Sequence, residues 1–299
     1  MLLGSGSEQY ASRINSETSW SLISCSIDSL NQVNNPPTFF SQLSELNIPF
    51  PSTRFEETLE KGSWLYKQAL SCGGMGVSRV NHLHQDPGDG YWQQELKGQS
   101  MSLLCLADGD DYRMIGINEL YSHAFLESHP YVYEGAVANF KIDIETYEKI
   151  DIYIEKLVNH FNLVGMFSLD MVIQDITPYA LEINPRISAS YELYELLNPG
   201  LNLVDAHIRV CEGVRLSDIE LGELTDQQIG YKIVYADEDY VVPSQLKWPQ
   251  WVKDKPEKHR FIASGEPICS IFSDSEDTGF RVRDILEERK NHVLNIIKQ

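Results

Sequence analysis

Two short segments, residues 167–173 (FSLDMVI) and 179–184 (YALEIN), constrain the fold of this chain more than any other part of it. Each alternates in character with the period of two that is typical of a strand buried on one face. In the second segment, this alternation places Ala180, Glu182 and Asn184 on one face. The five residues between the segments, QDITP, have a common hairpin-loop length. The sequence therefore predicts an antiparallel β-hairpin with polar side chains along one face.

The register of this hairpin indicates a metal site. If Ile173 pairs with Tyr179, Asp170 lies directly opposite Glu182, and facing like charges destabilise a sheet unless a cation lies between them. Asn184 adds an amide oxygen two residues further along the same face. Carboxylate and amide oxygens are the ligands that Mg²⁺ or Mn²⁺ prefers. Either carboxylate alone would fit a solvated strand face, but the register and the Asn-Pro-Arg that follows favour the metal.

A glycine-rich turn lies between two other strand-like segments, in WLYKQALSCGGMGVSRV. Lys67 belongs to the first segment, and Gly73, Gly74 and Gly76 form the turn. It lacks the Gly-Lys-Ser/Thr end of a Walker A motif, and no helix follows it as in a Rossmann fingerprint. Glycines let backbone N–H groups approach phosphate, and a lysine adds a point charge. The alternative interpretation is a plain hairpin with an exposed lysine.

The rest of the chain mixes helices and strands. Apolar spacing predicts helices ending before Pro49, over 147–161, over 202–212 and from about residue 280, with strands near 63–80, 100–109, 230–243 and 266–273. Short links between strands favour antiparallel pairing, so the expected fold class is α+β. We expect three parts: residues 1–53, 54–215 and a β-rich C-terminal part, 216–299.

Composition excludes several kinds of partner. The net charge of −20 over 299 residues disfavours nucleic acid and anionic lipid surfaces. No apolar stretch approaches the roughly 18 residues of a membrane span, and the first residues do not read as a signal peptide. Five scattered cysteines without a C-x-x-C pair are typical of free thiols in a reducing compartment. These features predict a cytoplasmic protein without a nucleic-acid or membrane partner.

In chain order, the Lys-bearing strand with GGMG (67–76), QQELKG (93–98), GMFSLD (165–170) and LEINPR (181–186) resemble the ATP-grasp superfamily. The resemblance covers roughly residues 36–213. It implies two α+β subdomains that clamp Mg-ATP and join a carboxylate to an amine through an acylphosphate.

Carried onto this sequence, the resemblance implies a role for each motif residue. Lys67 would hold the α- and β-phosphates under a lid made by Gly73, Gly74 and Gly76. Arg186 would face the transferred phosphate. The metal ligands would be Asp170, Glu182 and Asn184, and the hinge beside adenine would be Gln94, Glu95, Leu96 and Lys97.

A narrower resemblance extends almost to the C-terminus, through motifs such as YEGAV, LEINPRISAS, VYADEDYVVP and GEPICSI. It is to ATP-grasp proteins that accompany tetrahydromethanopterin and methylofuran one-carbon genes in methylotrophic bacteria. It implies an ADP-forming ligase with a carboxylate substrate, glutamate being one candidate, and a small amine. A homodimer is one assembly that it allows.

Two departures from the superfamily pattern keep alternatives open. A lysine usually precedes the FFxxLxxLxIPxP segment, where this chain reads NNPPT, and the N-terminal domain is only about 50 residues long. A non-catalytic nucleotide-binding partner is therefore a second hypothesis. The carboxylate pair alone would also suit a Mg-dependent phosphohydrolase.

Overall fold

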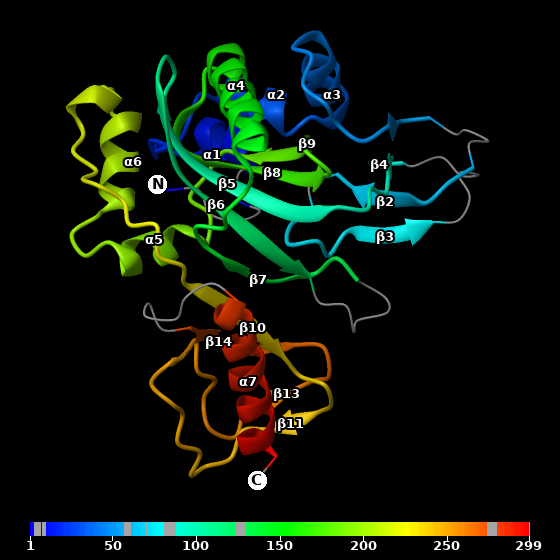
Figure 1. Cartoon of the computed structure of the whole chain (residues 1–299), viewed down its shortest axis with the longest axis vertical. Helices are drawn as coiled ribbons and strands as arrows, with labels where there is room; N and C mark the ends of the chain where they lie inside the picture. The colour runs from blue at the N-terminus through cyan, green and yellow to red at the C-terminus, as the bar shows by residue number, and fades with distance from the viewer. Residues whose placement is uncertain are drawn as a thin grey trace.

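The computed structural model of the chain describes residues 1–2, 7, 10–56, 61–69, 71–80, 88–122, 130–273 and 280–298, with residues 280 and 281 by backbone alone. A large antiparallel sheet runs through the molecule (Figure 1). Its eight strands lie in the order β12 (Val252–Lys253), β14 (Pro267–Phe272), β10 (Gly230–Tyr235), β7 (Tyr133–Val137), β6 (Tyr112–Ser122), β5 (Gln99–Asp108), β8 (Val164–Gln174) and β9 (Thr177–Asn184). Together with the helices, this sheet confirms the predicted α+β class.

A smaller sheet lies beside the end of the large one (Figure 1). It has the order β1 (Thr53–Arg54), β4 (Gly90–Gln94), β2 (Trp64–Gln68) and β3 (Val77–Val80). Every strand pair in both sheets, as far as the chain is described, is antiparallel. Residues 95–98 connect β4 directly to β5, so the two sheets are joined there by a short covalent link.

Helices cover the two faces of the large sheet. The N-terminal helices α1 (Ala11–Glu17), α2 (Ile27–Val33) and α3 (Pro36–Glu45) lie on one side with α4 (Ile144–Phe161). Phe40 of α3 and Ile154 of α4 are buried there in one apolar core with Leu103 and Leu169 of the sheet. The opposite face is covered by α5 (Tyr191–Leu197) and α6 (Leu203–Cys211), followed by a short 3₁₀ turn, Leu216–Asp218.

Local signals explain where the main helices begin. Asp143 caps α4 by accepting a hydrogen bond from the Thr146 N–H at 2.8 Å, so the helix starts three residues before the predicted boundary. Asn35 caps α3 in the same way, through Thr38 N–H at 3.0 Å, and Pro36 occupies the first helical turn. The helices predicted near 202–212 and from residue 280 are α6 and α7 (Phe280–Ile297).

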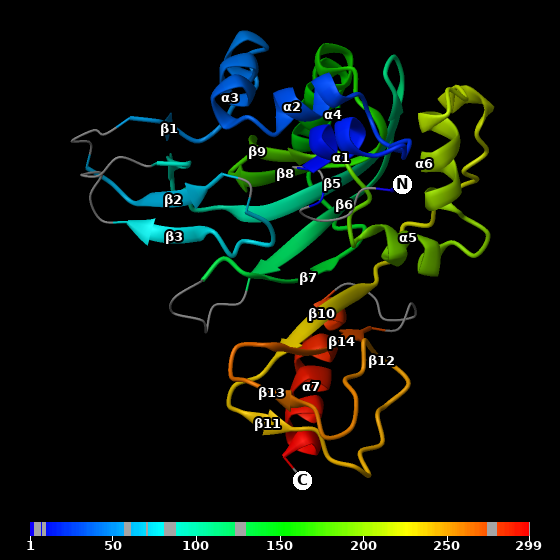
Figure 2. The same ribbon diagram turned by 180° about the vertical axis from the view of Figure 1, so that it is seen from behind.

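The C-terminal residues continue the large sheet. Strand β10 pairs with β7 and with β14, and α7 packs across β10 and β14 (Figure 2). A separate two-stranded ladder joins β11 (Tyr240–Val241) to β13 (Phe261–Ile262). Within the described helices, none has both the length and the apolar composition needed to cross a membrane.

The predicted hairpin is β8–β9, and Asp170 does pair with Glu182. Two details of the prediction were wrong. Ile173 pairs with Pro178 rather than Tyr179, because the connection is a two-residue turn at Asp175 and Ile176 rather than a five-residue loop. A bulge next to Asp170 then restores the expected pairing of the carboxylates.

The same bulge corrects the predicted face of Ala180. Its side chain is 2% exposed and packs in the core under α4, not beside Glu182. Leu181 is the extra residue of the bulge, so the alternation of β9 is interrupted there. The Ala180 N–H donates to the carbonyl of Pro49 at 2.8 Å, so the segment after α3 fixes this irregular edge.

Candidate functional site

The carboxylate pair, Asp170 and Glu182, lies on the large-sheet face opposite α4. Asp170 is half-buried and Glu182 is exposed. Ser102 of β5 pairs with Asp170 on its other side, and its hydroxyl donates to Asp170 Oδ1 at 2.6 Å. The pair therefore belongs to a polar row that crosses three neighbouring strands.

Asn184 and Arg186 extend this row at the end of β9. The Asn184 Nδ2 group lies 3.2 Å from Asp170 Oδ2 and 3.3 Å from Glu182 Oε1. The Asn184 Oδ1 atom accepts a hydrogen bond from Arg186 Nη2 at 3.0 Å. Pro185 follows β9, and since a proline has no N–H to continue the ladder, the strand ends there and the chain turns at Arg186.

These residues fit a divalent cation. Burial, together with the charge of Glu182, raises the pKa of Asp170 to about 7. A carboxylate in such a position is stabilised by a cation. No group of three or more His, Cys, Asp or Glu side chains gathers as a metal site in the described ranges. Here the ligand set would be two carboxylates, with Asn184 supplying an amide oxygen.

Lys67 faces this site from the small sheet. In β2, Lys67 pairs with Tyr91 of β4 and with Val77 of β3, and its side chain is half-buried. Burial lowers the pKa of the Lys67 amine, while the nearby carboxylates of Glu182 and Asp170 oppose that shift. Lysine and carboxylates thus face each other across the space between the two sheets.

The predicted glycine loop, residues 71–77, lies against the chain just before and at the start of β7. The Tyr133 N–H donates to the Gly73 carbonyl at 2.9 Å. A Cβ on Gly74 would lie 1.8 Å from the Tyr131 carbonyl oxygen, and one on Gly76 would lie 2.3 Å from a hydroxyl oxygen within the loop. Close backbone approach therefore requires glycine at position 74, whereas a Cβ at position 76 would meet the side chain of Ser71.

The predicted hinge residues occupy the link between the sheets, but the Glu95 side chain has a partner of its own. Gln94 ends β4, and Leu96 and Lys97 lie in the connection to β5. Glu95 accepts hydrogen bonds from Arg79 Nη2 at 2.8 Å and from the Tyr131 hydroxyl at 2.5 Å. Hydrogen bonds to Arg79 and Tyr131 outweigh burial and lower the pKa of Glu95, so this side chain ties the link to β3 and to the region before β7.

The sequence did not predict the buried hydrogen bonds that hold Ser102, the partner of Asp170, in place. The Asn118 side chain donates to the Ser102 carbonyl at 3.1 Å and accepts from the Tyr194 hydroxyl at 2.9 Å. Tyr194 and Asn118 are both fully buried. This chain of contacts links Asp170 to α5, the helix that follows Arg186. The only sequence signal was the position of Ser102 in a predicted strand.

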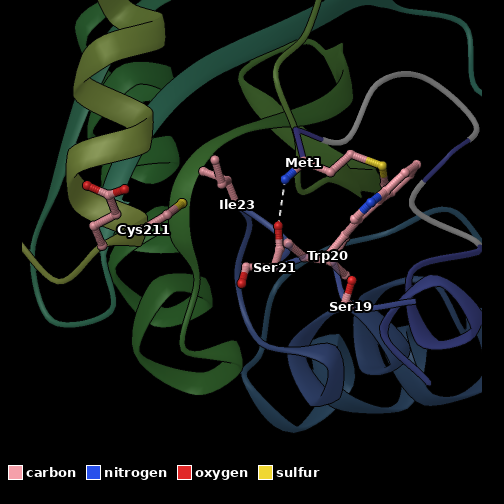
Figure 3. Close-up of a pocket in the computed structure, with 8 residues that line it drawn as sticks. Met1, Ser19, Trp20, Ser21, Ile23 and Cys211 are labelled. Carbon is pink, nitrogen blue, oxygen red and sulfur yellow. Dashed lines mark hydrogen bonds between the residues drawn. The ribbon is translucent and has the colours of Figure 1, made fainter. Parts of the chain in front are cut away.

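A separate cavity of about 760 Å³ lies between the N-terminal segment and the end of α6 (Figure 3). Its wall includes Met1, Trp20, Ile23 and Cys211. The Met1 ammonium group donates to the Ser21 carbonyl across one side of it. The cavity shares no lining residue with the carboxylate pair, so it is a different feature of the molecule.

The sequence profile of the ATP-grasp domain matches residues 33–190, slightly more than half of the chain. The chain belongs to the ATP-grasp family. The matched range contains both sheets up to the end of β9, including the glycine loop, the carboxylate pair and Arg186.

The related protein sequences align with only part of this chain, and this chain aligns with only part of each of them. An uncharacterised protein of Methanocaldococcus jannaschii is 28% identical over 134 residues, which are 44% of this chain and 32% of that protein. A carbamoyl phosphate synthase large chain of Thermoanaerobacter is 22% identical over 237 residues, 72% of this chain and 22% of the synthase chain. The chain therefore spans less than a third of the length of each of these two relatives.

Solved structures show the same fold at low sequence identity. An L-amino acid ligase of Bacillus licheniformis superposes with a TM-score of 0.72 at 14% identity, covering 95% of this chain and 75% of that one. The biotin carboxylase domain of a Hydrogenobacter thermophilus 2-oxoglutarate carboxylase, a dimer complexed with MgADP and bicarbonate, gives 0.71 at 11% identity. That match covers 99% of this chain and 76% of the domain.

Proposed function

We propose that this ATP-grasp protein is an ATP-dependent ligase that joins a carboxylate to an amine and releases ADP and phosphate. The observation that carries the proposal is the row of Asp170, Glu182, Asn184 and Arg186, which faces Lys67 across the two sheets. Membership of the family and the ligase and carboxylase neighbours support an ATP-dependent reaction of this class.

Each group in the row has a task in such a reaction. Lys67 and the N–H groups of the glycine loop would bind phosphate oxygens, and residues 94–97 would contact the adenine. Asp170, Glu182 and Asn184 would hold Mg²⁺ or Mn²⁺, which neutralises phosphate charge when bound. Arg186 would stabilise the charge that develops as the phosphoryl group is transferred.

The reaction would proceed in two displacements. A carboxylate oxygen of the substrate attacks the γ-phosphorus, and the bond to the bridging oxygen breaks to release ADP and form an acylphosphate. The amine then attacks the carbonyl carbon, and phosphate leaves. Positioning between the two sheets and charge neutralisation would supply most of the rate gain.

The substrates can be proposed more narrowly. We propose glutamate as the carboxylate and a small amine as its partner, in one-carbon cofactor biosynthesis of the methylofuran and tetrahydromethanopterin type. Only the resemblance of motifs between residues 101 and 271 supports this assignment. A cytoplasmic homodimer is part of the same proposal.

One observation favours a second function, nucleotide binding without turnover. Where related chains carry a lysine before the FFxxLxxL segment, Asn35 and Pro36 are used here to start α3. If catalysis requires the positive charge of that lysine, the protein would bind Mg-ATP but not turn it over.

ADP release with glutamate and a panel of amines tests the proposed function. ADP formation that requires an amine supports the ligase. Binding of Mg-ATP without turnover supports the second function, and amine-independent phosphate release would indicate a phosphohydrolase. In the ligase, Arg186→Ala should lower kcat with little change in ATP binding, and Arg186→Lys should recover part of the rate because it keeps charge but loses the planar fork. Full turnover with only a lower melting temperature would contradict this role for Arg186.

A further inference from the structure

The orientation of the Asn184 side chain is set by its neighbours. Its Nδ2 group, which can only donate, points at the carboxylates of Asp170 and Glu182, at 3.2 and 3.3 Å. Its Oδ1 atom, which can only accept, points at the guanidinium of Arg186, at 3.0 Å. Both ends of the amide are therefore matched in charge, and the neutral NH₂ group lies within hydrogen-bond distance of both carboxylates.

This orientation conflicts with binding a cation through Asn184. An amide coordinates a divalent cation through its oxygen, because its nitrogen has no lone pair to offer. Turning Oδ1 toward the carboxylates would turn Nδ2 toward Arg186. Two donors cannot form a hydrogen bond, so the contact between Asn184 and Arg186 cannot survive the turn.

We propose that the Asn184 amide reverses when a divalent cation binds at the carboxylate pair, and that this reversal releases Arg186 from its hydrogen bond to Asn184. The inference rests on the proposed function for the identity of the ligands, but it concerns the coupling between two protein side chains. Arg186 also donates to the Ile187 carbonyl from Nη1, so the reversal changes only the contact of its Nη2 group, which phosphate oxygens would then accept from. Asn184 is thus a positioning residue for Arg186 as well as a ligand.

Such coupling has a reciprocal consequence. If the cation weakens the contact between Asn184 and Arg186, then a phosphate group that draws Arg186 away should strengthen cation binding. The nucleotide and the cation would therefore favour each other through protein contacts, in addition to their direct attraction.

Isotope-edited NMR of the whole chain tests the proposal. The side-chain signals of Asn184 and of the Arg186 guanidinium are followed as Mg²⁺ is added in the presence of ADP, with ADP alone as reference. Both signals should shift together with the same Mg²⁺ midpoint. The Asn139 amide, which donates to the carbonyls of Thr225 and Gln227 at 2.9 and 2.7 Å, is the internal control and should not shift.

An Asn184→Asp variant sharpens the test. A carboxylate can offer one oxygen to the cation and the other to Arg186, so Mg²⁺ should still bind while the Arg186 response is lost. If three facing carboxylates prevent this variant from folding, the wild-type titration still decides the question.

The outcomes separate this inference from the proposed function. A shift of Asn184 without a shift of Arg186 overturns the coupling but leaves the metal site intact. Retention of the full Arg186 response in Asn184→Asp also overturns it. If calorimetry shows that MgADP binds while neither signal moves, both the coupling and the metal role of Asn184 are wrong, and absence of any MgADP binding contradicts the proposed function itself.

Discussion

The large sheet carries acidic side chains in two places, and their hydrogen-bond partners differ. Beneath α7, Glu119 is 4% exposed and Glu134 is 5% exposed. Glu119 accepts hydrogen bonds from Arg283, including one from Nε at 2.9 Å. Glu134 pairs with Lys290 at 2.8 Å and with Lys232 at 3.4 Å. Each buried carboxylate there has a cation from the chain itself.

The carboxylate pair at the other end of the sheet has neutral donors instead. Ser102 and Asn184 donate to Asp170, and Asn184 also donates to Glu182. The positive charges near the pair are Arg186, which interacts electrostatically with Asp170, and Lys67, which interacts with both carboxylates.

We infer from this difference that the cluster beneath α7 is structural and that the Asp170–Glu182 pair is a binding site. A buried acid that only stabilises the fold requires a fixed cation, because an unpaired buried charge costs several kcal/mol. A half-buried acid whose direct hydrogen-bond donors are neutral, as at Asp170, can be stabilised by an external cation or by taking up a proton. The raised pKa of Asp170 is the second of these responses.

Removing a cation from beneath α7 should have the largest effect on stability. Lys232 has a side chain only 8% exposed and contacts both Glu134 and Glu287. We expect Lys232→Ala to lower the free energy of unfolding by about 3 kcal/mol, with or without Mg²⁺, since it leaves buried carboxylates underpaired. Urea unfolding measures this. Lys298→Ala, at a half-exposed ion pair with Asp237, is the control and should cost much less stability. Equal losses in the two variants would contradict the comparison.

Removing a charge from the carboxylate pair should do the opposite. Asp170 has a pKa of about 7 when folded, above the value of about 3.9 in an unfolded chain, so its ionisation opposes folding as the pH rises between these values. In metal-free protein at pH 8, Asp170→Asn should therefore raise the free energy of unfolding by roughly 2–3 kcal/mol. The gain should shrink as the pH falls toward 5. A loss of stability at pH 8 would show that Asp170 is structural, like Glu119.

The hydroxyl behind Asp170 should have a smaller effect, on metal affinity rather than stability. Ser102→Ala removes the 2.6 Å hydrogen bond that orients Asp170. Losing a hydrogen bond that orients a metal ligand typically weakens metal binding by about tenfold. The Mg²⁺ concentration that gives half of the ADP-induced rise in melting temperature measures it. Ser100→Ala, one step along the same face of β5 and opposite Val172, is the control. An unchanged midpoint in Ser102→Ala would remove Ser102 from the site.

The smallest expected effect lies at the exposed link between the sheets. Arg79 is 63% exposed on its side chain, so Arg79→Ala should cost at most about 1 kcal/mol of stability. Hydrogen exchange across residues 71–77 should nevertheless become faster without nucleotide, because Arg79 holds Glu95 and Tyr131 beside the glycine loop. Nucleotide should slow that exchange in the wild type. If the loop exchanges equally with and without nucleotide, it is a plain hairpin.

The pairing of Asp170 with Glu182 could be predicted from the sequence because both residues belong to one hairpin with a period of two. The bulge at Leu181 could not, since it depends on Pro49, which is more than a hundred residues away in the chain. Alternation alone therefore placed Ala180 on the wrong face. The predicted pairing of the carboxylates was right although the turn was two residues long rather than five.

The side chains that hold the site residues in place could not be predicted from the sequence either, because their contacts join strands that are far apart in the chain. Ser102 meets Asp170 only because β5 lies between β6 and β8, and that order is set by contacts far apart in the chain. The same holds for Tyr194 of α5, whose hydroxyl donates to Asn118. Glu95 was expected at an adenine-binding hinge, and its ion pair with Arg79 depends on how β3 folds back beside the link.

The most direct test of the account is the effect of Mg²⁺ on stabilisation by ADP. The melting temperature of the wild type should rise more with ADP and Mg²⁺ together than with ADP alone, because the cation completes the carboxylate pair. Glu182→Gln should lose the Mg²⁺-dependent part of this rise. Glu145→Gln, at an exposed ion pair with Lys149, should keep it. A full Mg²⁺-dependent rise in Glu182→Gln would contradict the claim that the Asp170–Glu182 pair is the metal site of this protein.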